Sequence, residues 1–166
     1  MTRRRAHAFG FFKVRQLGGY GWIVDRAPAV VVVAIAPDER VWLARMRRVA
    51  ARSNAWELPG GGIDGREDEI AAGLRELEEE CGLVARGRVR LVAPPFEAAP
   101  GMGRFPHHVV VAQKVVPRDR RAVGQAAEGI TDVRGFSRTG VRRMIARGAI
   151  TAMPSIAALV VSGWLR

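Results

Sequence analysis

The stretch that most constrains this chain is a glycine-rich turn followed at once by a carboxylate-rich segment, from Gly61 to Leu83. On a helical wheel of about 100° per residue, the apolar residues of the segment share one narrow stripe. Within about 40° of Ile70, this stripe comprises Ile70, Leu74, Leu77 and Cys81. The pattern predicts a helix from about Asp68 to Cys81 that packs on a core and ends at Gly82.

The acidic residues of the same helix fall on a separate arc, about 100° wide. They are Glu69, Glu76, Glu79 and Glu80. Like charges three and four residues apart repel each other, so this face costs stability unless a cation lies against it. Ligands that are all oxygen suit a hard divalent ion such as magnesium. Beside the helix, the three glycines from Gly60 to Gly62 leave backbone N–H groups that a ligand can approach closely.

The rest of the chain predicts strands and helices around this centre. The segment from Ala29 to Ala36 is continuously apolar and β-branched, as in a strand buried on both faces. Further strands are expected at 41–46, 56–59, 88–92, 107–116 and 130–136, and further helices at 137–146 and 154–165. This order predicts an α/β fold, a sandwich with a mixed sheet. Residues 1–27 are expected to form a basic segment, frayed over 1–12 and with one or two short strands after that, and residues 28–166 the main domain.

Composition narrows the class of protein. With 166 residues, of which 48% are hydrophobic, the chain fits one domain with a real core. Its one cysteine, Cys81, allows no intramolecular disulfide, which favours a reducing compartment. The run from Ala29 to Ala36 is too short to span a bilayer, and the basic start has no apolar stretch long enough for a signal peptide. We expect a cytoplasmic protein without a membrane partner.

The net charge of +11 has two interpretations. It indicates either a polyanionic partner, such as nucleic acid or a phosphate-rich small molecule, or arginines dispersed over a solvated surface. Clusters occur only at Arg3–Arg5, Arg45–Arg48 and Arg118–Arg121, and no RNA-binding motif with interleaved aromatic residues is present. The dispersed surface is favoured, and nucleic acid stays open as a partner.

The spacing from Gly61 onward resembles the Nudix box at every defined position: Gly61, Glu67, Arg75-Glu76-Leu77, Glu79-Glu80 and Gly82-Leu83. The resemblance implies the Nudix α/β/α sandwich. It also implies hydrolysis of a nucleoside diphosphate linked to another moiety, dependent on Mg²⁺ or Mn²⁺. The residues matching the family's metal ligands are Glu76, Glu79 and Glu80. The resemblance further implies that Arg75 orients these carboxylates, that Gly61 faces the diphosphate and that Glu67 is an outer acid.

The flanks of the box resemble the ADP-ribose pyrophosphatase branch. Arg48 and the run Glu57-Leu58-Pro59-Gly60-Gly61 match it, with Gly60 in place of an alanine whose carbonyl contributes to metal binding. Pro100-Gly101 lies close to the place of a proline beyond the box. The substrate-binding residues so implied are Arg48, Glu57, Gly61, Gly62, Pro100 and Gly101. The branch implies hydrolysis of ADP-ribose or a related nucleotide sugar to AMP and a sugar phosphate, and a homodimer that exchanges N-terminal strands.

The remaining candidates for functional residues are two glutamates that could act as the general base, and two neighbouring histidines. Glu128, on a loop before the last strand, is the first choice for the base because the branch carries its loop glutamate there, and Glu97 is the second. A surface carboxylate is the alternative for either. His107 and His108 are neighbours on a strand, so they point to opposite faces and a structural role is favoured over a shared ligand.

Two other functions stay open. The first is a Nudix pyrophosphohydrolase that acts on nucleoside triphosphates, dinucleoside polyphosphates or RNA 5′ ends, which the charge of +11 favours. The second is a non-catalytic nucleotide-binding Nudix module. Such modules usually lose box glutamates, whereas this chain keeps all of them.

Overall fold

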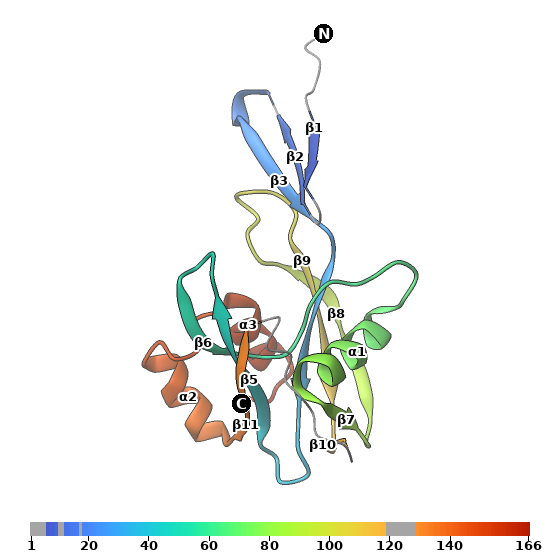
Figure 1. Cartoon of the computed structure of the whole chain (residues 1–166), viewed down its shortest axis with the longest axis vertical. Coiled ribbons are helices and arrows are strands. Elements are labelled where there is room, and N and C mark those ends of the chain that lie inside the picture. The colour runs from blue at the N-terminus through green and yellow to red at the C-terminus, as the bar shows by residue number, and fades with distance from the viewer. Residues whose placement is uncertain (1–5, 10–11, 17, 119–128) are drawn as a thin grey trace.

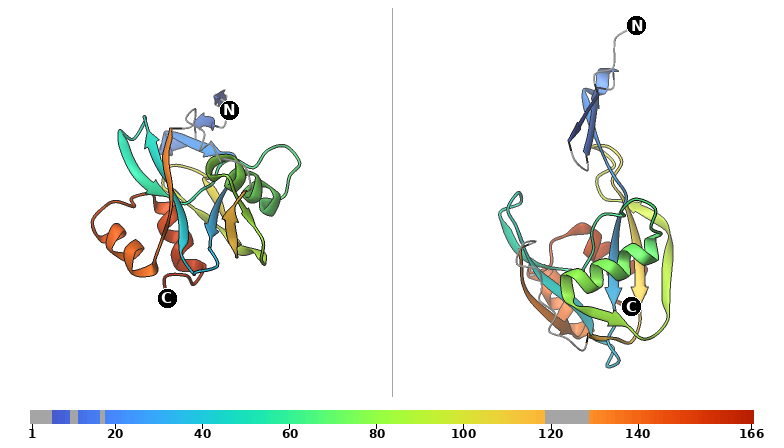
Figure 2. Two further views of the ribbon diagram at one scale, coloured as in Figure 1. Left: turned by 60° about the horizontal axis from the view of Figure 1, so that its bottom comes forward. Right: turned by 45° about the vertical axis from the view of Figure 1, so that its right-hand side comes forward.

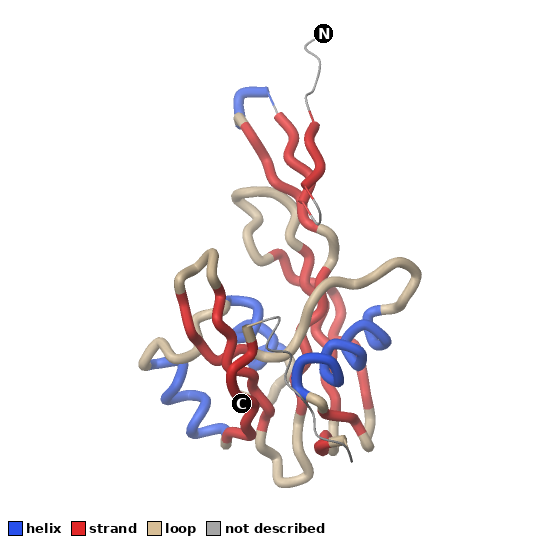
Figure 3. The backbone as a smooth tube through the Cα atoms, in the orientation of Figure 1, coloured by secondary structure: helices blue, strands red, loops and turns tan. Residues whose placement is uncertain are grey.

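The structure, a computed structural model, describes residues 6–9, 12–16, 18–118 and 129–166. Its main body holds two three-stranded sheets (Figures 1 and 3). In the first, β4 (Ala29–Ala34) pairs in parallel with β9 (Pro106–Ala112), which pairs antiparallel with β8 (Val89–Glu97). In the second, β5 (Val41–Arg48) lies between β6 (Ser53–Glu57) and β11 (Ile130–Phe136), with both pairings antiparallel. A short pair joins β7 (Leu83–Ala85) to β10 (Val115–Pro117).

Helices cover the strands from two sides. The helix α1 (Glu69–Cys81) packs over one core, and α2 (Arg138–Ala146) and α3 (Met153–Val161) pack over the other. Strand β4 serves both cores, because Val30 and Val32 face α1 whereas Val31 and Val33 face the other two helices. This division explains the continuous apolar run of the strand, and it confirms the predicted α/β sandwich with a mixed sheet.

The helix α1 begins and ends as its sequence predicts. The side chain of Asp68 caps the first turn by accepting a hydrogen bond from the Ala71 N–H at 2.7 Å. Gly82 ends the helix with φ 59°, and its N–H donates to the Glu78 carbonyl. Of the predicted apolar stripe, Leu77 and Cys81 are buried, whereas Ile70 and Leu74 are half-buried at its edge. The helix is therefore fixed at both ends and along one face.

A third sheet projects from the body (Figures 1 and 2). It comprises β1 (Ala6–Phe9), β2 (Phe12–Gln16) and β3 (Trp22–Arg26), all antiparallel, with a single 3₁₀ turn at Gly18–Tyr20. The loop after β8 holds the base of this sheet, since Val24 N–H donates to the Met102 carbonyl at 2.9 Å and Arg26 N–H to the Arg104 carbonyl at 2.8 Å. The prediction that residues 1–12 are frayed is wrong where β1 and β2 form. The boundary between residues 27 and 28 stays a prediction.

Several element boundaries differ from the prediction. Strand β8 continues to Glu97 through Pro94 and Pro95, because a bulge between Val92 and Phe96 accommodates two residues without an N–H. The expected strand at 107–116 is two strands, since Lys114 turns the chain with φ 51°. The last helix stops at Val161, followed closely by Gly163 with φ 82°. The strand β7 was not expected, and β6 begins three residues earlier and ends two residues earlier than predicted.

No helix in the described part of the chain is long and apolar enough to cross a membrane. Cys81 is a free, buried cysteine on the inner face of α1. Burial raises the pKa of its thiol well above the usual value, and the charge of Glu80 acts in the same direction. The thiol is therefore a core group rather than a nucleophile.

Candidate active site

A cleft of about 630 Å³ opens where the glycine turn, α1 and the first residues of β4 and β9 meet. Its size fits a small-molecule site. The charged side chains that line it are Arg26, Arg48, Glu57, Asp64, Arg75, Glu76, Glu79 and Glu80. The rest of the described lining comes from the glycine turn, from His107, from apolar residues of β4 and just after β6 (Ala29, Val30, Val31 and Leu58), and from the start of α3 (Ala152, Pro154 and Ser155). The cleft thus gathers residues from both ends of the sequence.

The glycine turn lies flat against β4. The Val30 N–H donates to the Gly61 carbonyl at 2.9 Å, and the Val32 N–H donates to the Pro59 carbonyl at 2.8 Å. A Cβ atom on Gly60 would lie 2.1 Å from the Val30 carbonyl oxygen. Only glycine therefore fits at position 60 without moving the backbone.

Two carboxylates of α1 press against this turn. Oε2 of Glu80 accepts the Gly60 N–H at 2.8 Å. The carboxylate of Glu76 packs on the Cα of Gly61, where an added Cβ would lie 2.3 Å from Oε1. Glu76 is 8% exposed and Glu80 is 3% exposed. Burying a carboxylate is costly unless it is paired and hydrogen-bonded, and both carboxylates here have partners, Arg75 for Glu76 and the Gly60 N–H for Glu80. Two buried acids side by side at an open cleft indicate a candidate functional site.

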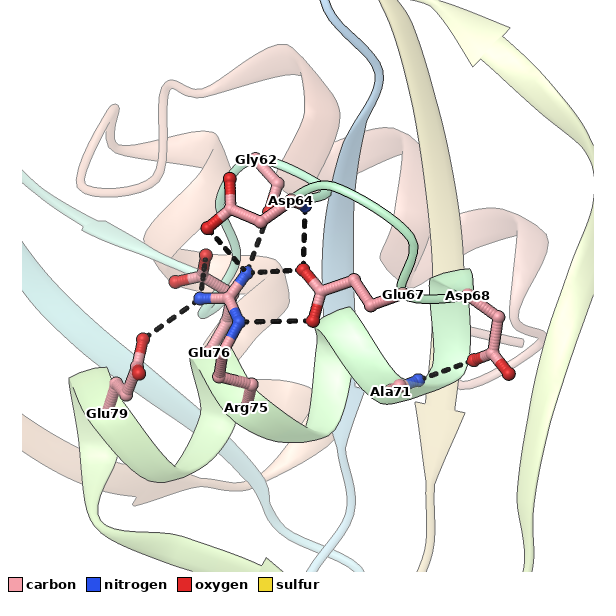
Figure 4. Close-up of polar contacts among 8 residues, drawn as sticks. All are labelled: Gly62, Asp64, Glu67, Asp68, Ala71, Arg75, Glu76 and Glu79. Carbon is pink, nitrogen blue, oxygen red and sulfur yellow. Dashed lines mark hydrogen bonds and ion pairs between the residues drawn. The ribbon is translucent and has the colours of Figure 1, made fainter.

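Arg75 holds the acidic side chains in place (Figure 4). Its guanidinium makes two hydrogen bonds to Glu67, at 2.8 and 3.2 Å, and donates to the Gly62 carbonyl at 3.0 Å. Its Nη1 donates to Oε1 of Glu76 and to Oε2 of Glu79, both at 2.9 Å. One planar fork thus joins the turn to the helix, a geometry that lysine cannot reproduce.

These contacts shift two pKa values. The hydrogen bond with Glu67, followed by those with Glu79 and Glu76, raises the pKa of Arg75 further above its usual value. The same hydrogen bonds from Arg75, with the Asp64 N–H at 2.7 Å, hold the pKa of Glu67 below its ordinary 4.5. Both groups are therefore fully charged at neutral pH.

Glu69 does not join the other acids. It lies two turns before Glu76, about 10 Å along the helix axis. Its Oε1 lies 3.5 Å from Nδ1 of His108, and Glu69 is outside the described lining of the cleft. The helical wheel places Glu69 on the acidic arc because a wheel ignores distance along the axis.

The donor chemistry of the cleft fits a hard divalent cation. Five acids and three arginines line it, so its formal charge is −2 in a protein of net charge +11. A diphosphate cannot enter such a cleft favourably unless cations accompany it. Within the described residues, no three His, Cys, Asp or Glu side chains are already grouped as a coordination sphere. In this arrangement Arg75 and the Gly60 N–H engage the carboxylates.

The structure also brings Arg48 and Glu57 together at the cleft. Nε of Arg48 donates to Oε1 of Glu57 at 3.2 Å, and Nη2 donates to Oε2 at 2.9 Å. The two residues pair across neighbouring strands β5 and β6, nine positions apart in sequence. A two-point pair of this kind fixes the orientation of both side chains on the wall of the cleft.

Other predicted site residues lie elsewhere. Oε2 of Glu97 accepts the Phe105 N–H at 2.7 Å, which folds the loop after β8, and Glu97 is not part of the described lining of the cleft. Pro100 and Gly101 form the exposed turn of that loop, also outside this lining. Glu128 lies outside the described residues.

Among the cleft residues that the sequence did not single out are two with basic side chains. Arg26 comes from the end of β3, and His107 comes from the start of β9. His107 and His108 do point to opposite sides, as strand geometry requires, and His107 is the one that faces the cleft. The parallel pairing of β9 with β4 decides this, and no local sequence signal could have shown it.

Comparison with known proteins identifies the family. The model of the NUDIX domain matches residues 25–149, about three quarters of the chain. The chain belongs to the NUDIX family. The matched NUDIX segment includes the glycine turn, α1 and both central sheets, which build most of the cleft, whereas the start of α3 lies beyond the matched segment.

Several curated proteins are similar to this NUDIX chain over part of their length. A CMP-5′-(N-acetyl-N-hydroxy-3-aminopropyl)phosphonate hydrolase of Streptomyces rubellomurinus is 33% identical over 52% of this chain and 42% of its own. An RNA pyrophosphohydrolase of Caulobacter vibrioides is 48% identical over 35% of this chain and 33% of its own. An ADP-ribose pyrophosphatase of Bacillus subtilis is 29% identical over 56% of this chain and 49% of its own. The chain thus matches half or less of the length of each.

Solved structures agree on the fold of the NUDIX chain. An ADP compounds hydrolase superposes with a TM-score of 0.72 at 20% identity, covering 99% of this chain and 95% of that one. A NUDIX hydrolase from Nitrosomonas europaea gives 0.65 at 19% identity, covering 82% and 88%. At these identities the similarity establishes the fold alone.

Proposed function

We propose that this NUDIX protein hydrolyses the diphosphate of a nucleotide sugar, with ADP-ribose or a related compound giving AMP and a sugar phosphate. One observation carries the proposal: Glu76 and Glu80 are buried against the glycine turn, at Gly61 and Gly60, inside a cleft of net negative charge. In a helix whose acidic face is simply solvated, the carboxylates are exposed to water. Two carboxylates buried beside an open backbone turn are what a binding site for a divalent cation and a diphosphate requires.

Mg²⁺ or Mn²⁺ completes the site in this proposal. The side chains that would hold it are Glu76, Glu79 and Glu80, with the carbonyl of Gly60. When bound, such an ion neutralises the phosphate oxygens and lowers the pKa of a bound water.

Hydrogen bonds within the protein hold the side chains of the site in defined positions. Arg75 holds Glu76 and Glu79, and the Gly60 N–H holds Glu80, so the carboxylates start from defined positions on one helix and regroup when an ion binds. Arg48 and Glu57 hold each other on another wall, where they are available to the nucleotide. Glu128 stays the predicted general base, with a box glutamate as the alternative. Glu97 is less suited because its carboxylate folds its own loop.

Hydrolysis of RNA 5′ ends is the second candidate. The 48% identity with the RNA pyrophosphohydrolase of Caulobacter vibrioides and the charge of +11 favour it. That identity extends over only 58 residues, however. The B. subtilis ADP-ribose pyrophosphatase matches a longer stretch, 93 residues, and the Arg48–Glu57 pair follows the pattern of that branch. We therefore rank the nucleotide sugar first.

A panel of substrates tests the choice. ADP-ribose, ADP-glucose, ATP, diadenosine tetraphosphate and 5′-triphosphorylated RNA are incubated with Mg²⁺ or Mn²⁺, and the products are separated by chromatography. Release of AMP and ribose 5-phosphate from ADP-ribose is expected, with Glu80→Gln as the inactive control. Reaction of RNA 5′ ends alone would contradict the proposal, and no reaction of any compound would favour a binding module.

We further propose a homodimer that covers the projecting sheet. Trp22 and Phe12 on that sheet are 53% and 39% exposed, and the sheet extends away from the body (Figure 2). A second copy can bury this surface. A mass near twice 18.1 kDa by light scattering is expected, and a monomer at all concentrations would contradict it. The cytoplasmic location stays a prediction.

A further inference from the structure

His107 is a buried imidazole on the wall of the cleft that the catalytic proposal does not use. It is 9% exposed and lies at the start of β9, paired with Ala29 of β4 on one side and with Phe96 of β8 on the other. A smaller hollow lined by Phe96, Val109 and Pro154 shares His107 with the cleft. The ring thus stands at the junction of a polar and an apolar space.

The hydrogen bond at Nδ1 fixes the tautomer of this ring. Nδ1 lies 2.8 Å from the carbonyl oxygen of Phe105, which can only accept, so Nδ1 carries the proton. Burial lowers the pKa of His107, and electrostatic interactions with Arg26 and His108 act in the same direction. The Phe105 carbonyl and the charge of Glu97 oppose this change without reversing it. The ring is neutral at pH 7, and its Nε2 is a hydrogen-bond acceptor.

This acceptor is accessible from a space that His107 lines. Within the described part of the chain, the hydrogen bond of the His107 ring is at Nδ1, and Nε2 has none. In the same part of the chain, every side-chain nitrogen or oxygen that is fully buried has a hydrogen-bond partner. Nε2 is therefore accessible, and the spaces that His107 lines are the cleft and the adjoining hollow. A ligand that extends from the cleft toward the adjoining hollow passes this imidazole.

Strand spacing gives the distance from the glycine turn. Gly62 forms a bridge with Ala29, and Ala29 pairs with His107. Two spacings of just under 5 Å place the backbone of His107 about 10 Å from the backbone of the turn. A group linked to the diphosphate through the next few bonds lies at that range.

Because Nε2 of the neutral His107 ring can only accept a hydrogen bond, it binds only groups that donate one. Ionised phosphate oxygens have only lone pairs, so they cannot donate to Nε2, whereas a hydroxyl group can. We propose that His107 is a specificity-determining residue whose Nε2 accepts a hydrogen bond from a sugar hydroxyl beyond the diphosphate. This inference rests on the proposed function and gives a reason for preferring a nucleotide sugar to a triphosphate. Arg26, on the same wall, is a donor and can serve another sugar or phosphate oxygen.

Two substitutions separate the acceptor from the fold. His107→Asn keeps an N–H near the position of Nδ1, and so the bond to the Phe105 carbonyl, but removes the acceptor. His107→Gln can place a carbonyl oxygen near the position of Nε2. His108→Asn, on the opposite side of the strand beside Glu69, is the matched control. Thermal unfolding of each variant shows whether the fold is preserved.

The measurement compares two substrates with Mg²⁺. ADP-ribose carries the sugar, and the β-methyl ester of ADP has the same diphosphate without it. His107→Asn is expected to lower kcat/KM for ADP-ribose about 10- to 100-fold, the effect of leaving a buried polar group unpaired. It should change the methyl ester less than twofold, and His107→Gln should restore most of the loss. IDP-ribose, which lacks the adenine amino group, should follow ADP-ribose.

Other results overturn the inference. An equal loss on both substrates makes His107 structural, and no loss on ADP-ribose removes it from recognition. If His107→Asn leaves IDP-ribose unaffected, the donor is the adenine amino group instead. Should the wild-type protein hydrolyse neither compound, the proposed function fails separately. Both ligands are then titrated calorimetrically, and ADP-ribose binding that is no tighter than methyl ester binding contradicts the role of His107.

Discussion

The N–H of Gly60 donates a hydrogen bond of 2.8 Å to Oε2 of Glu80, across twenty positions of sequence. This bond ties the glycine turn to the last turns of α1. Because Gly60 also lies against the Val30 carbonyl, one residue joins β4, the turn and the helix. The site is therefore rigid where the substrate and its cation would meet.

Substitution of Gly60 by alanine should destabilise the protein. The added Cβ would lie 2.1 Å from a backbone oxygen of β4, which cannot move without shifting the strand. We expect a loss of about 1–3 kcal/mol in the free energy of unfolding, measured in urea. Gly101→Ala is the control, since nothing lies within 4 Å of its added Cβ, and should stay within about 0.5 kcal/mol of the wild type. Equal stability of the two variants would contradict the tight packing.

Glu80→Gln should abolish turnover while preserving the fold. Its amide oxygen can still accept the Gly60 N–H, but the negative charge is gone. We expect kcat to fall about 10²-fold or more, with weaker Mg²⁺ binding by calorimetry. Glu78→Gln serves as the control, because Glu78 pairs with Arg118 outside the cleft. Near-normal activity of Glu80→Gln would refute the proposed metal site.

Arg75→Lys should lower activity although it keeps the positive charge. A lysine has a single side-chain nitrogen, so its N–H groups cannot span the separate positions from which Nε, Nη1 and Nη2 of Arg75 reach Glu67, Glu76 and Glu79. The expected loss in kcat/KM is about 10- to 100-fold, as for residues that orient metal ligands. Arg66→Lys, an exposed change on the neighbouring loop, should have no effect. If both variants retain full activity, orientation by Arg75 is not required.

Acid should weaken the contribution of Glu67 to stability. Because its folded pKa lies below 4.5, this contribution is complete above the unfolded value and is lost as pH falls through the folded value. In urea titrations between pH 3 and 7, the wild type should exceed Glu67→Gln in stability by a constant amount above about pH 5. The difference should shrink below pH 4.5. Glu39→Gln, on the turn before β5, controls for the loss of one acid, and a difference independent of pH would contradict the Glu67–Arg75 interaction.

Local patterns were sufficient to predict much of the fold. Asp68 and Gly82 fix the ends of α1 through contacts within a few residues. The apolar strand that begins at Ala29 is buried, as its continuous run of apolar residues predicts. Errors arose where tertiary pairing overrides local preference. Two prolines at 94–95 predict a loop, yet pairing with β9 extends β8 across them through a bulge.

Part of the candidate site likewise follows from local sequence, and part depends on the tertiary structure. Glu76, Glu79, Glu80 and Arg75 share one helix, so their relative positions follow from helix geometry, and the sequence alone determined them. Which other residues face them was decided only in three dimensions. His107 and Arg26 enter the cleft because β9 begins, and β3 ends, beside the start of β4, whereas Glu97 and Gly101 lie outside its described lining. Contacts between residues distant in sequence depend on strand order and register, which no single segment encodes.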